Sequence, residues 1–234
     1  MRNEHSIINL VNLTNEEKEY FELQEQISDL LIVMIGRRID LKMSQREFAK
    51  ACGIKQPMIA RIERMDATPR IDTLIKMCNA FIIPGGTTFN KTDEYLIKFA
   101  IDNDIPLLGI CAGMQAICNL NHFDEKVSDQ TIKIDTDLLM DHYSNKDECV
   151  HSVDIITPFF KDIFKDGRFG VNSRHHYQVK EEDFFIIDAR AIDGVVEGIH
   201  IPNKTFIVGV EWHPEDLDDI YSKRLFEAFI KSIK

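Results

Sequence analysis

The ten residues PLLGICAGMQ, at positions 106–115, constrain the fold of this 234-residue chain more than any other stretch. An apolar run that predicts a strand stops at Ile110, and the residues from Ala112 onward predict a helix, so Cys111 stands at a sharp turn. A nucleophile held on such a turn sits at a strained position among small neighbours, and the dipole of the following helix favours its thiolate. The alternative is a buried core cysteine beside a packing glycine.

Length and cysteine use indicate the broad class of the protein. A chain of 234 residues can bury one large core or two small ones, and we expect two domains. The five cysteines are scattered, odd in number and without CxxC spacing, which favours a reducing compartment. Because the sequence has neither a membrane-length apolar run nor the pattern of a signal peptide, we expect a cytoplasmic protein with no membrane contact.

Charge is distributed unevenly along the chain. Residues 1–29 hold two basic and seven acidic residues, a net charge of −5, and residues 30–80 hold ten basic and five acidic residues, a net charge of +5. Residues 81–234 hold sixteen basic and twenty-seven acidic residues, a net charge of −11. Since an acidic surface repels DNA, any contact with a polyanion is expected to be confined to the middle block.

The basic middle block carries the pattern of three short helices. Ser44 and Glu47 form a capping box that predicts a helix over 44–52, and a turn glycine separates it from a second helix over 56–64. A third helix is predicted from residue 70. Two helices joined by a tight turn form a helix-turn-helix unit, whose second helix enters the major groove of DNA. The alternative is a small helical bundle with basic, solvated faces.

This block resembles the Cro/repressor-type (XRE) helix-turn-helix family over residues 27–80. The resemblance implies double-stranded DNA as a partner of an all-α domain over residues 1–80. It implies base-edge contacts from Gln56, Met58 and Arg61. It implies phosphate contacts from Gln45, Arg46 and Lys55.

Residues 14–39 predict one long amphipathic helix upstream of this unit. Its apolar residues exceed what one small bundle needs to cover, and proteins that read paired half-sites usually dimerise. We therefore expect a homodimer, with a plain core helix as the alternative.

From Phe81 onward, short apolar runs alternate with helical stretches, which predicts an α/β domain with a parallel sheet and a β-rich second half. Sites in such sheets form at the carboxyl ends of strands. Three polar motifs fall at predicted strand ends: Pro84-Gly85-Gly86, Cys111, and VEWHPED, which contains His213 and Glu215.

His213 and Glu215 have the residue types that a cysteine nucleophile needs. A base must take the thiol proton and an acid must orient the base, and residues two apart on an extended segment point the same way. Taken alone, a histidine near a carboxylate is more often structural, but three such motifs at strand ends favour a catalytic centre.

Residues 81–234 resemble a class I glutamine amidotransferase domain of the gamma-glutamyl-gamma-aminobutyrate hydrolase (peptidase C26) branch, through the motifs PGG, GICAGMQ, VNSRHHYQ and GVEWHPE. The resemblance implies a flavodoxin-like α/β fold and a small gamma-glutamyl amide substrate. It implies that Cys111 attacks the side-chain carboxamide, that His213 is the general base and acid, and that Glu215 orients it. Gly86 and Ala112 would stabilise the oxyanion. The implied pocket residues are Gln115, Asn172, Ser173, His175 and His176.

The paired histidines of NSRHHYQ have a second interpretation as metal ligands. They share no regular spacing with His151, His200 or the carboxylates of the chain, so we expect no metal and no cofactor.

One departure from the family lies before the PGG motif. Relatives carry strand and helix units ahead of this loop, whereas here a helix ending at Ala80 runs directly into the strand at Phe81. We therefore expect a domain that lacks its first strand-helix units and has an apolar edge, covered by the N-terminal helices or by a second chain.

Two functions compete at this point. One is a cysteine-dependent hydrolase of gamma-glutamyl amides, impaired or intact, tethered to a DNA-binding module. The alternative is a transcriptional regulator whose amidotransferase-like domain senses a gamma-glutamyl compound with slow turnover or none. Because no synthetase or ammonia-accepting domain is seen in the sequence, hydrolysis is favoured over amide transfer.

Overall fold

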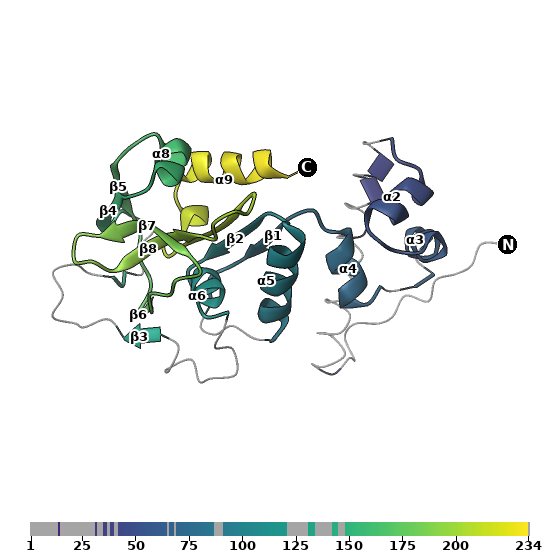
Figure 1. Cartoon of the computed structure of the whole chain (residues 1–234), viewed down its shortest axis with the longest axis horizontal. Helices are drawn as coiled ribbons and strands as arrows, with labels where there is room; N and C mark the ends of the chain where they lie inside the picture. Colours follow the sequence, from purple (N-terminus) through teal and green to yellow (C-terminus); the bar gives the residue numbers. More distant parts are fainter. Residues whose placement is uncertain are drawn as a thin grey trace. The chain divides into compact units, whose positions relative to one another are not determined.

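The computed structural model describes residues 14, 31, 35–36, 38–39, 42–64, 66–67, 69–86, 91–120, 131–133, 142–144 and 148–233. The chain divides into two compact units, Met1–Cys78 and Asn79–Lys234, and each is described by itself (Figure 1). Most of the helix predicted over residues 14–39 lies outside the described residues.

The first unit contains the predicted helix-turn-helix. Its helices are α2 (Gln45–Ala51), α3 (Gln56–Glu63) and α4 (Ile71–Met77). The capping box is present, because the Glu47 N–H donates to the Ser44 hydroxyl at 3.2 Å and the Ser44 N–H donates to the Glu47 carboxylate at 2.8 Å. Gly53 turns the chain between α2 and α3 at a φ of +63°, which glycine adopts without strain. The buried core of this unit consists of Leu31, Ala49, Ile59, Ile62, Leu74 and Met77.

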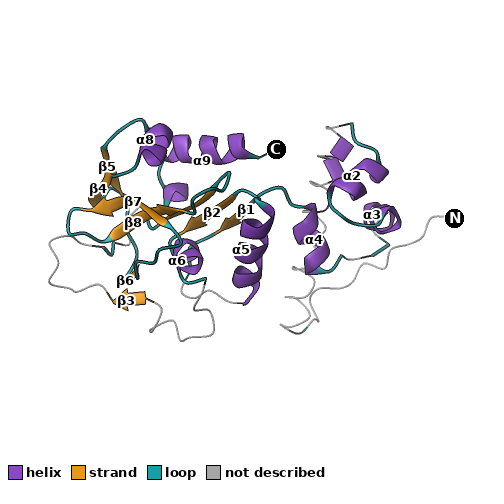
Figure 2. Ribbon diagram, in the orientation of Figure 1, coloured by secondary structure: helices purple, strands orange, loops and turns teal. Residues whose placement is uncertain are grey.

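The second unit alternates strands and helices, as Figure 2 shows. Its first half contains β1 (Phe81–Ile83), α5 (Lys91–Asn103), β2 (Leu107–Ile110), α6 (Ala112–Cys118) and β3 (Thr131–Lys133). Its second half contains β4 (His151–Ile155), α8 (Pro158–Phe164), β5 (Arg168–Val171), β6 (Tyr177–Val179), β7 (Ile186–Ala191), β8 (Val196–His200), β9 (Ile207–Val210), the 3-10 helix η2 (Pro214–Asp216) and α9 (Ile220–Ser232).

Seven of these strands form one mixed sheet in the order β1-β2-β9-β8-β7-β4-β5. The pairs β1–β2 and β2–β9 are parallel, and the remaining pairs are antiparallel. The strands β3 and β6 form a separate antiparallel pair. The α/β architecture and the β-rich second half are confirmed, and the parallel part of the sheet is limited to the three strands whose ends carry the polar motifs.

Helices cover both faces of the sheet. Leu108 of β2 packs in one core cluster with residues of α8 and α9, while the adjacent Leu107 packs in another with residues of α5 and α6. Successive side chains of a strand point to opposite faces, so β2 contributes to both cores. The sheet therefore forms the middle layer of three.

Strand β1 stands at one edge of the sheet. It pairs with β2, and among the described residues no strand lies beyond it. Ile82 of this strand is 47% exposed, which leaves an apolar side chain at the edge. The arrangement agrees with the predicted loss of the first strand-helix units. None of the described helices combines the length and the apolar character needed to cross a bilayer.

Candidate active site

Cys111 occupies the predicted sharp turn between β2 and α6. Its backbone has φ 50° and ψ −110°, a conformation that a non-glycine residue adopts only under strain. The Cys111 N–H still donates to the Val210 carbonyl at 2.8 Å, so the turn continues the β2–β9 pairing before the helix begins. The cysteine is 6% exposed. Strained backbone at the carboxyl end of a buried strand is the geometry of a nucleophile elbow.

The elbow requires small residues because the backbone segments around it approach very closely. A methyl group built on Gly113 would lie 2.1 Å from the Ile83 carbonyl oxygen, and one on Gly109 would lie 2.7 Å from the backbone of Gly113. Helix α6 thereby lies directly against the ends of β1 and β2, and its first residue, Ala112, follows the cysteine at once.

The three polar motifs meet at the carboxyl ends of three neighbouring strands. Strands β1, β2 and β9 are adjacent and parallel, with the strand of Cys111 in the middle, so their carboxyl ends lie side by side. A methyl group built on Gly85 would lie 2.6 Å from Cε1 of His213 and 3.5 Å from Cβ of Cys111. The loop after β1 is therefore in contact with both candidate catalytic side chains. Gly86, expected in the oxyanion hole, is the exposed neighbour of Gly85.

His213 and Glu215 form the expected pair. Nδ1 of His213 lies 2.8 Å from Oε1 of Glu215, and the histidine side chain is 12% exposed. A carboxylate beside Nδ1 holds the proton on that nitrogen, which leaves the Nε2 lone pair free to accept a proton.

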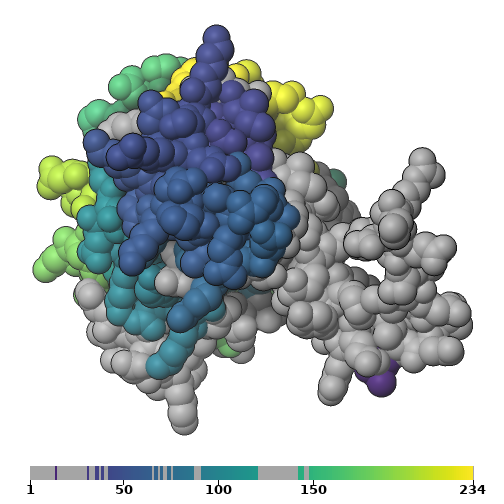
Figure 3. Space-filling view, turned by 90° about the vertical axis from the view of Figure 1, so that its right-hand side faces the viewer, coloured from purple at the N-terminus to yellow at the C-terminus, as the bar shows by residue number. Residues whose placement is uncertain are grey.

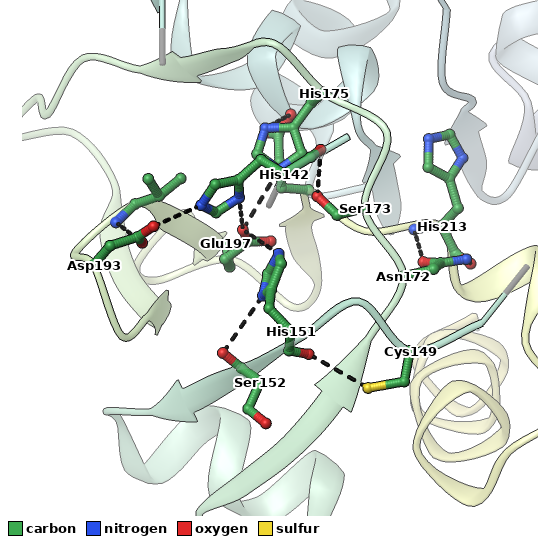
Figure 4. Close-up of polar contacts among 12 residues, drawn as sticks. His142, Cys149, His151, Ser152, Asn172, Ser173, His175, Asp193, Glu197 and His213 are labelled. Carbon is green, nitrogen blue, oxygen red and sulfur yellow. Dashed lines mark hydrogen bonds and ion pairs between the residues drawn. The ribbon is translucent and has the colours of Figure 1, made fainter. Parts of the chain in front are cut away.

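Asn172 holds the backbone of His213 in place. Its side-chain amide donates to the His213 carbonyl at 2.9 Å and its side-chain oxygen accepts from the His213 N–H at 2.9 Å (Figure 4). Asn172 is fully buried. The resemblance implied that Asn172 lines the substrate pocket; its contacts give it a positioning role that the sequence motif did not indicate.

The Cys111 thiol has a raised pKa. Burial, with a smaller contribution from the Glu211 carboxyl, raises the pKa of this thiol to about 12, against which the hydrogen bond from the Ala112 N–H acts in the lowering direction. Burial also raises the pKa of the Glu211 carboxyl to about 8, so this carboxyl is mostly neutral at neutral pH. Desolvation is therefore the main cause of the raised pKa of the Cys111 thiol. Burial therefore opposes the thiolate that the following helix is expected to favour.

The remaining predicted pocket residues contact other parts of the protein, and Gln115 lies on α6, the helix that follows Cys111. The Gln115 amide donates to the Glu211 carboxyl at 2.6 Å, and the Ser173 hydroxyl donates to the His142 carbonyl at 2.7 Å. His175 is buried, whereas His176 is exposed and stacks on Tyr143. Contact of these side chains with substrate stays a prediction.

The candidate DNA-contacting residues lie on α2, α3 and the turn between them (Figure 3, purple to blue). Arg46, Lys55, Met58 and Arg61 are exposed. Gln45 and Gln56 are half-buried and bonded to each other at 2.9 Å, which orients the first side chain of α3. Ile59 and Ile62 occupy the buried face of α3, so the helix presents a polar face opposite the core.

Comparison with known proteins places the chain in a class and then in a family. The family and homologue matches support a hydrolase- or amidotransferase-type enzyme joined to a helix-turn-helix unit. The family model of Peptidase C26 matches residues 87–215, and the chain belongs to this family. A helix-turn-helix family model matches residues 37–85.

Two curated relatives extend this result. A glutamine amidotransferase-like protein of Rickettsia prowazekii is 27% identical, over 70% of this chain and 80% of that protein. The CTP synthase of Methanosphaera stadtmanae is 25% identical, over 97% of this chain, and the match spans 50% of that longer protein.

Solved structures share the fold at low sequence identity. A glutamine amidotransferase from Methylobacillus flagellatus has a TM-score of 0.52 and 12% identity, over 74% of this chain and 83% of that chain. The glutaminase domain of Trypanosoma brucei CTPS, solved with bound acivicin, has a TM-score of 0.51 and 19% identity, over 94% of this chain and 90% of that chain. These similarities establish the amidotransferase fold.

Proposed function

We propose that this protein hydrolyses a gamma-glutamyl amide bond with Cys111 as the nucleophile, and that its DNA-binding unit tethers this activity to double-stranded DNA. One observation carries the proposal: a strained cysteine, a histidine–glutamate pair and a glycine loop converge on one edge of the sheet. Membership of Peptidase C26 supports the reaction type.

The first half of the reaction acylates the cysteine. Nε2 of His213 takes the proton from the Cys111 sulfur as the sulfur attacks the carbonyl carbon of the side-chain amide. Negative charge develops on the carbonyl oxygen, where the Ala112 N–H and the Gly86 loop stabilise it. The C–N bond then breaks, His213 returns the proton to the leaving amine, and a gamma-glutamyl thioester remains on Cys111.

The second half releases glutamate. His213 takes a proton from water, the resulting hydroxide attacks the thioester, and the C–S bond breaks. The cysteine regains its proton from His213. Because burial raises the pKa of the Cys111 thiol, proton transfer to His213 accompanies the attack in this scheme. Glu215 stabilises the charged imidazole while it holds that proton.

The helix-turn-helix unit gives the enzyme a second partner. Exposed Met58 and Arg61, with Gln56 held by Gln45, would face base edges, while Arg46 and Lys55 would contact phosphates. Binding to paired half-sites would require a homodimer. The proposed site of action is the cytoplasm.

A second candidate function is that of a ligand-sensing transcriptional regulator. The burial of Cys111 and its raised pKa favour this alternative, because both slow the formation of a thioester. In this case a gamma-glutamyl compound binds at the elbow and changes the affinity for DNA without being consumed.

One experiment separates the two functions. The full-length protein is incubated with glutamine, gamma-glutamyl-GABA and a gamma-glutamyl anilide, and glutamate release is followed with wild type, Cys111→Ser and Cys149→Ser. Hydrolysis predicts turnover that is lost in Cys111→Ser and kept in Cys149→Ser, since Cys149 is an exposed cysteine outside the elbow. Saturable binding without glutamate release would support the sensor, and equal turnover in Cys111→Ser would overturn the nucleophile.

A further inference from the structure

A cluster of three histidines and one carboxylate, which includes the predicted pocket residue His175, is buried without a part in the acylation and hydrolysis steps (Figure 4). His142, His151 and His175 are 3–4% exposed, and Glu197 is fully buried. Each offers one ligand atom, and these four atoms all lie within 4.8 Å of one another. His151 begins β4 and Glu197 lies on β8, while the other two residues belong to the segments joined by the Tyr143–Arg174 bridge.

The distances from the Glu197 carboxylate oxygen fit a single tetrahedral ion. Nδ1 of His142 lies 3.3 Å from Oε1 of Glu197, and Nε2 of His151 and Nε2 of His175 each lie 3.4 Å from the same oxygen. Ligand atoms bound to Zn²⁺ at about 2.0–2.1 Å in tetrahedral geometry are separated from one another by about 3.3–3.4 Å. The carboxylate oxygen therefore stands at the expected spacing from all three imidazole nitrogens.

The outer nitrogens of the three rings have acceptors of their own. Nε2 of His142 lies 2.9 Å from Oδ2 of Asp193, and Nδ1 of His175 lies 3.0 Å from the Tyr177 carbonyl oxygen. Nδ1 of His151 faces a backbone carbonyl oxygen at 3.5 Å. An acceptor on the outer side holds the proton there and turns the lone pair of the other nitrogen inward, as in metal-binding histidines.

The inner atoms are buried, and within the part of the chain that the structure describes no residue makes a hydrogen bond to them. They are Nδ1 of His142, Nε2 of His151, Nε2 of His175 and both carboxylate oxygens of Glu197. Buried polar atoms in folded proteins are almost always satisfied, and leaving them unpaired is costly.

Without an ion, the only acceptor that the described residues offer to all three inner nitrogens is one oxygen of Glu197, and for His142 and His175 this would require a second proton on rings whose outer nitrogens already face acceptors. The His142 ring lies 4.7 Å and 5.0 Å, centroid to centroid, from the other two rings, so any such charges would be buried close together. A divalent cation satisfies all four inner atoms while the three rings stay neutral.

We propose that His142, His151, His175 and Glu197 bind one Zn²⁺ ion in a closed, structural site. Three imidazole nitrogens and one carboxylate oxygen are a donor set that zinc accepts, and four protein ligands leave no open position for substrate. Asp193 is the positioning residue, because it orients the His142 ring.

The site ties together segments that support the proposed base. His175 follows Asn172 by three residues, and Asn172 holds the His213 backbone. Between them, the Ser173 hydroxyl donates to the carbonyl of the ligand His142. The ion would therefore fix the segment that positions His213, without touching the reacting atoms.

Zinc content and cobalt spectroscopy test the proposal on the full-length protein. After dialysis against a chelator and titration with Zn²⁺, we expect one bound ion per chain by elemental analysis and a rise in the melting temperature. Co²⁺ in place of Zn²⁺ should produce the intense visible bands of a tetrahedral site. Failure to bind Zn²⁺ at one equivalent, or a weak octahedral cobalt spectrum, would overturn the proposal.

Variants identify the ligands. His151→Ala and Glu197→Gln should lose the bound ion, Asp193→Asn should weaken binding about 10–100-fold, and the exposed His176→Ala should bind like wild type. Loss of zinc in His176→Ala to the same degree as in His151→Ala would contradict the assignment. Should the ligand variants fail to fold, zinc-edge X-ray absorption of the wild-type protein decides: three imidazoles support the site, and sulfur ligands or six oxygens exclude it.

Discussion

Asn172 bonds to the backbone of His213 on both sides of that residue, donating to its carbonyl and accepting from its N–H, each at 2.9 Å. A buried side chain with two such bonds leaves the segment between β9 and η2 little freedom to shift. The position of the proposed base therefore depends on a residue from the segment that follows β5.

Replacing Asn172 tests this dependence. Asn172→Ala leaves backbone groups of His213 unpaired, at a cost of about 1–3 kcal/mol for each buried group, so the melting temperature should fall. A displacement of His213 by about 1 Å should lower kcat/KM about 100-fold. Asn172→Asp keeps the acceptor for the His213 N–H, so its melting temperature and its kcat/KM should lie between those of the wild type and of Asn172→Ala. A wild-type rate of glutamate release in Asn172→Ala would show that His213 does not need this support.

Gly85→Ala should disable the site while leaving most of the stability intact. The added methyl group would lie 2.6 Å from Cε1 of His213, so the imidazole must leave its present position. Gly167→Ala is the matched control, because no atom of the described residues lies within 4 Å of its added methyl group. We expect glutamate release to fall at least about tenfold in Gly85→Ala and to stay unchanged in Gly167→Ala. Equal rates in the two variants would contradict the convergence of the three motifs.

The pH dependence of Cys111 alkylation should report its raised pKa. With a pKa of about 12, the thiolate fraction rises tenfold for each pH unit throughout the range from 7 to 10. The rate of iodoacetamide labelling, followed by mass spectrometry of the Cys111 peptide, should rise in the same proportion without a plateau. A thiol with a lowered pKa would give a labelling rate that levels off below pH 8. A plateau in that range would therefore contradict the raised pKa and support a thiolate stabilised by the helix.

Two substitutions should separate base contacts from phosphate contacts on the DNA-binding unit. A preferred duplex is first selected. If Arg61 makes a bidentate hydrogen-bonded contact with a base edge, Arg61→Ala should weaken binding to this duplex by about 1–3 kcal/mol and relax the sequence preference. Lys55→Ala should weaken binding to selected and random duplexes alike and reduce the salt dependence. Fluorescence anisotropy at several salt concentrations measures both effects. Identical behaviour of the two variants would refute the assigned roles.

Features that depend on neighbours in the chain could be predicted from the sequence. The capping box of α2 uses residues three apart, and the turn at Cys111 needs only a strand, small residues and a helix in succession. The sequence also predicts that the three motifs share one site, because neighbouring parallel strands place their carboxyl ends together. These are local rules, so the amino-acid order is enough to apply them.

Other features depended on contacts between distant segments. The clamp of Asn172 on His213 joins residues 41 apart, and no spacing rule points to it. The four proposed zinc ligands come from four segments without regular spacing, so the sequence alone argued against a metal. The pKa of the Cys111 thiol is a third example. The helix that favours the thiolate is next to Cys111 in the sequence, whereas the burial that raises the pKa comes from the packed sheet as a whole. Tertiary structure decided these points because desolvation and ligand geometry depend on which side chains surround an atom, and chain order does not determine that directly.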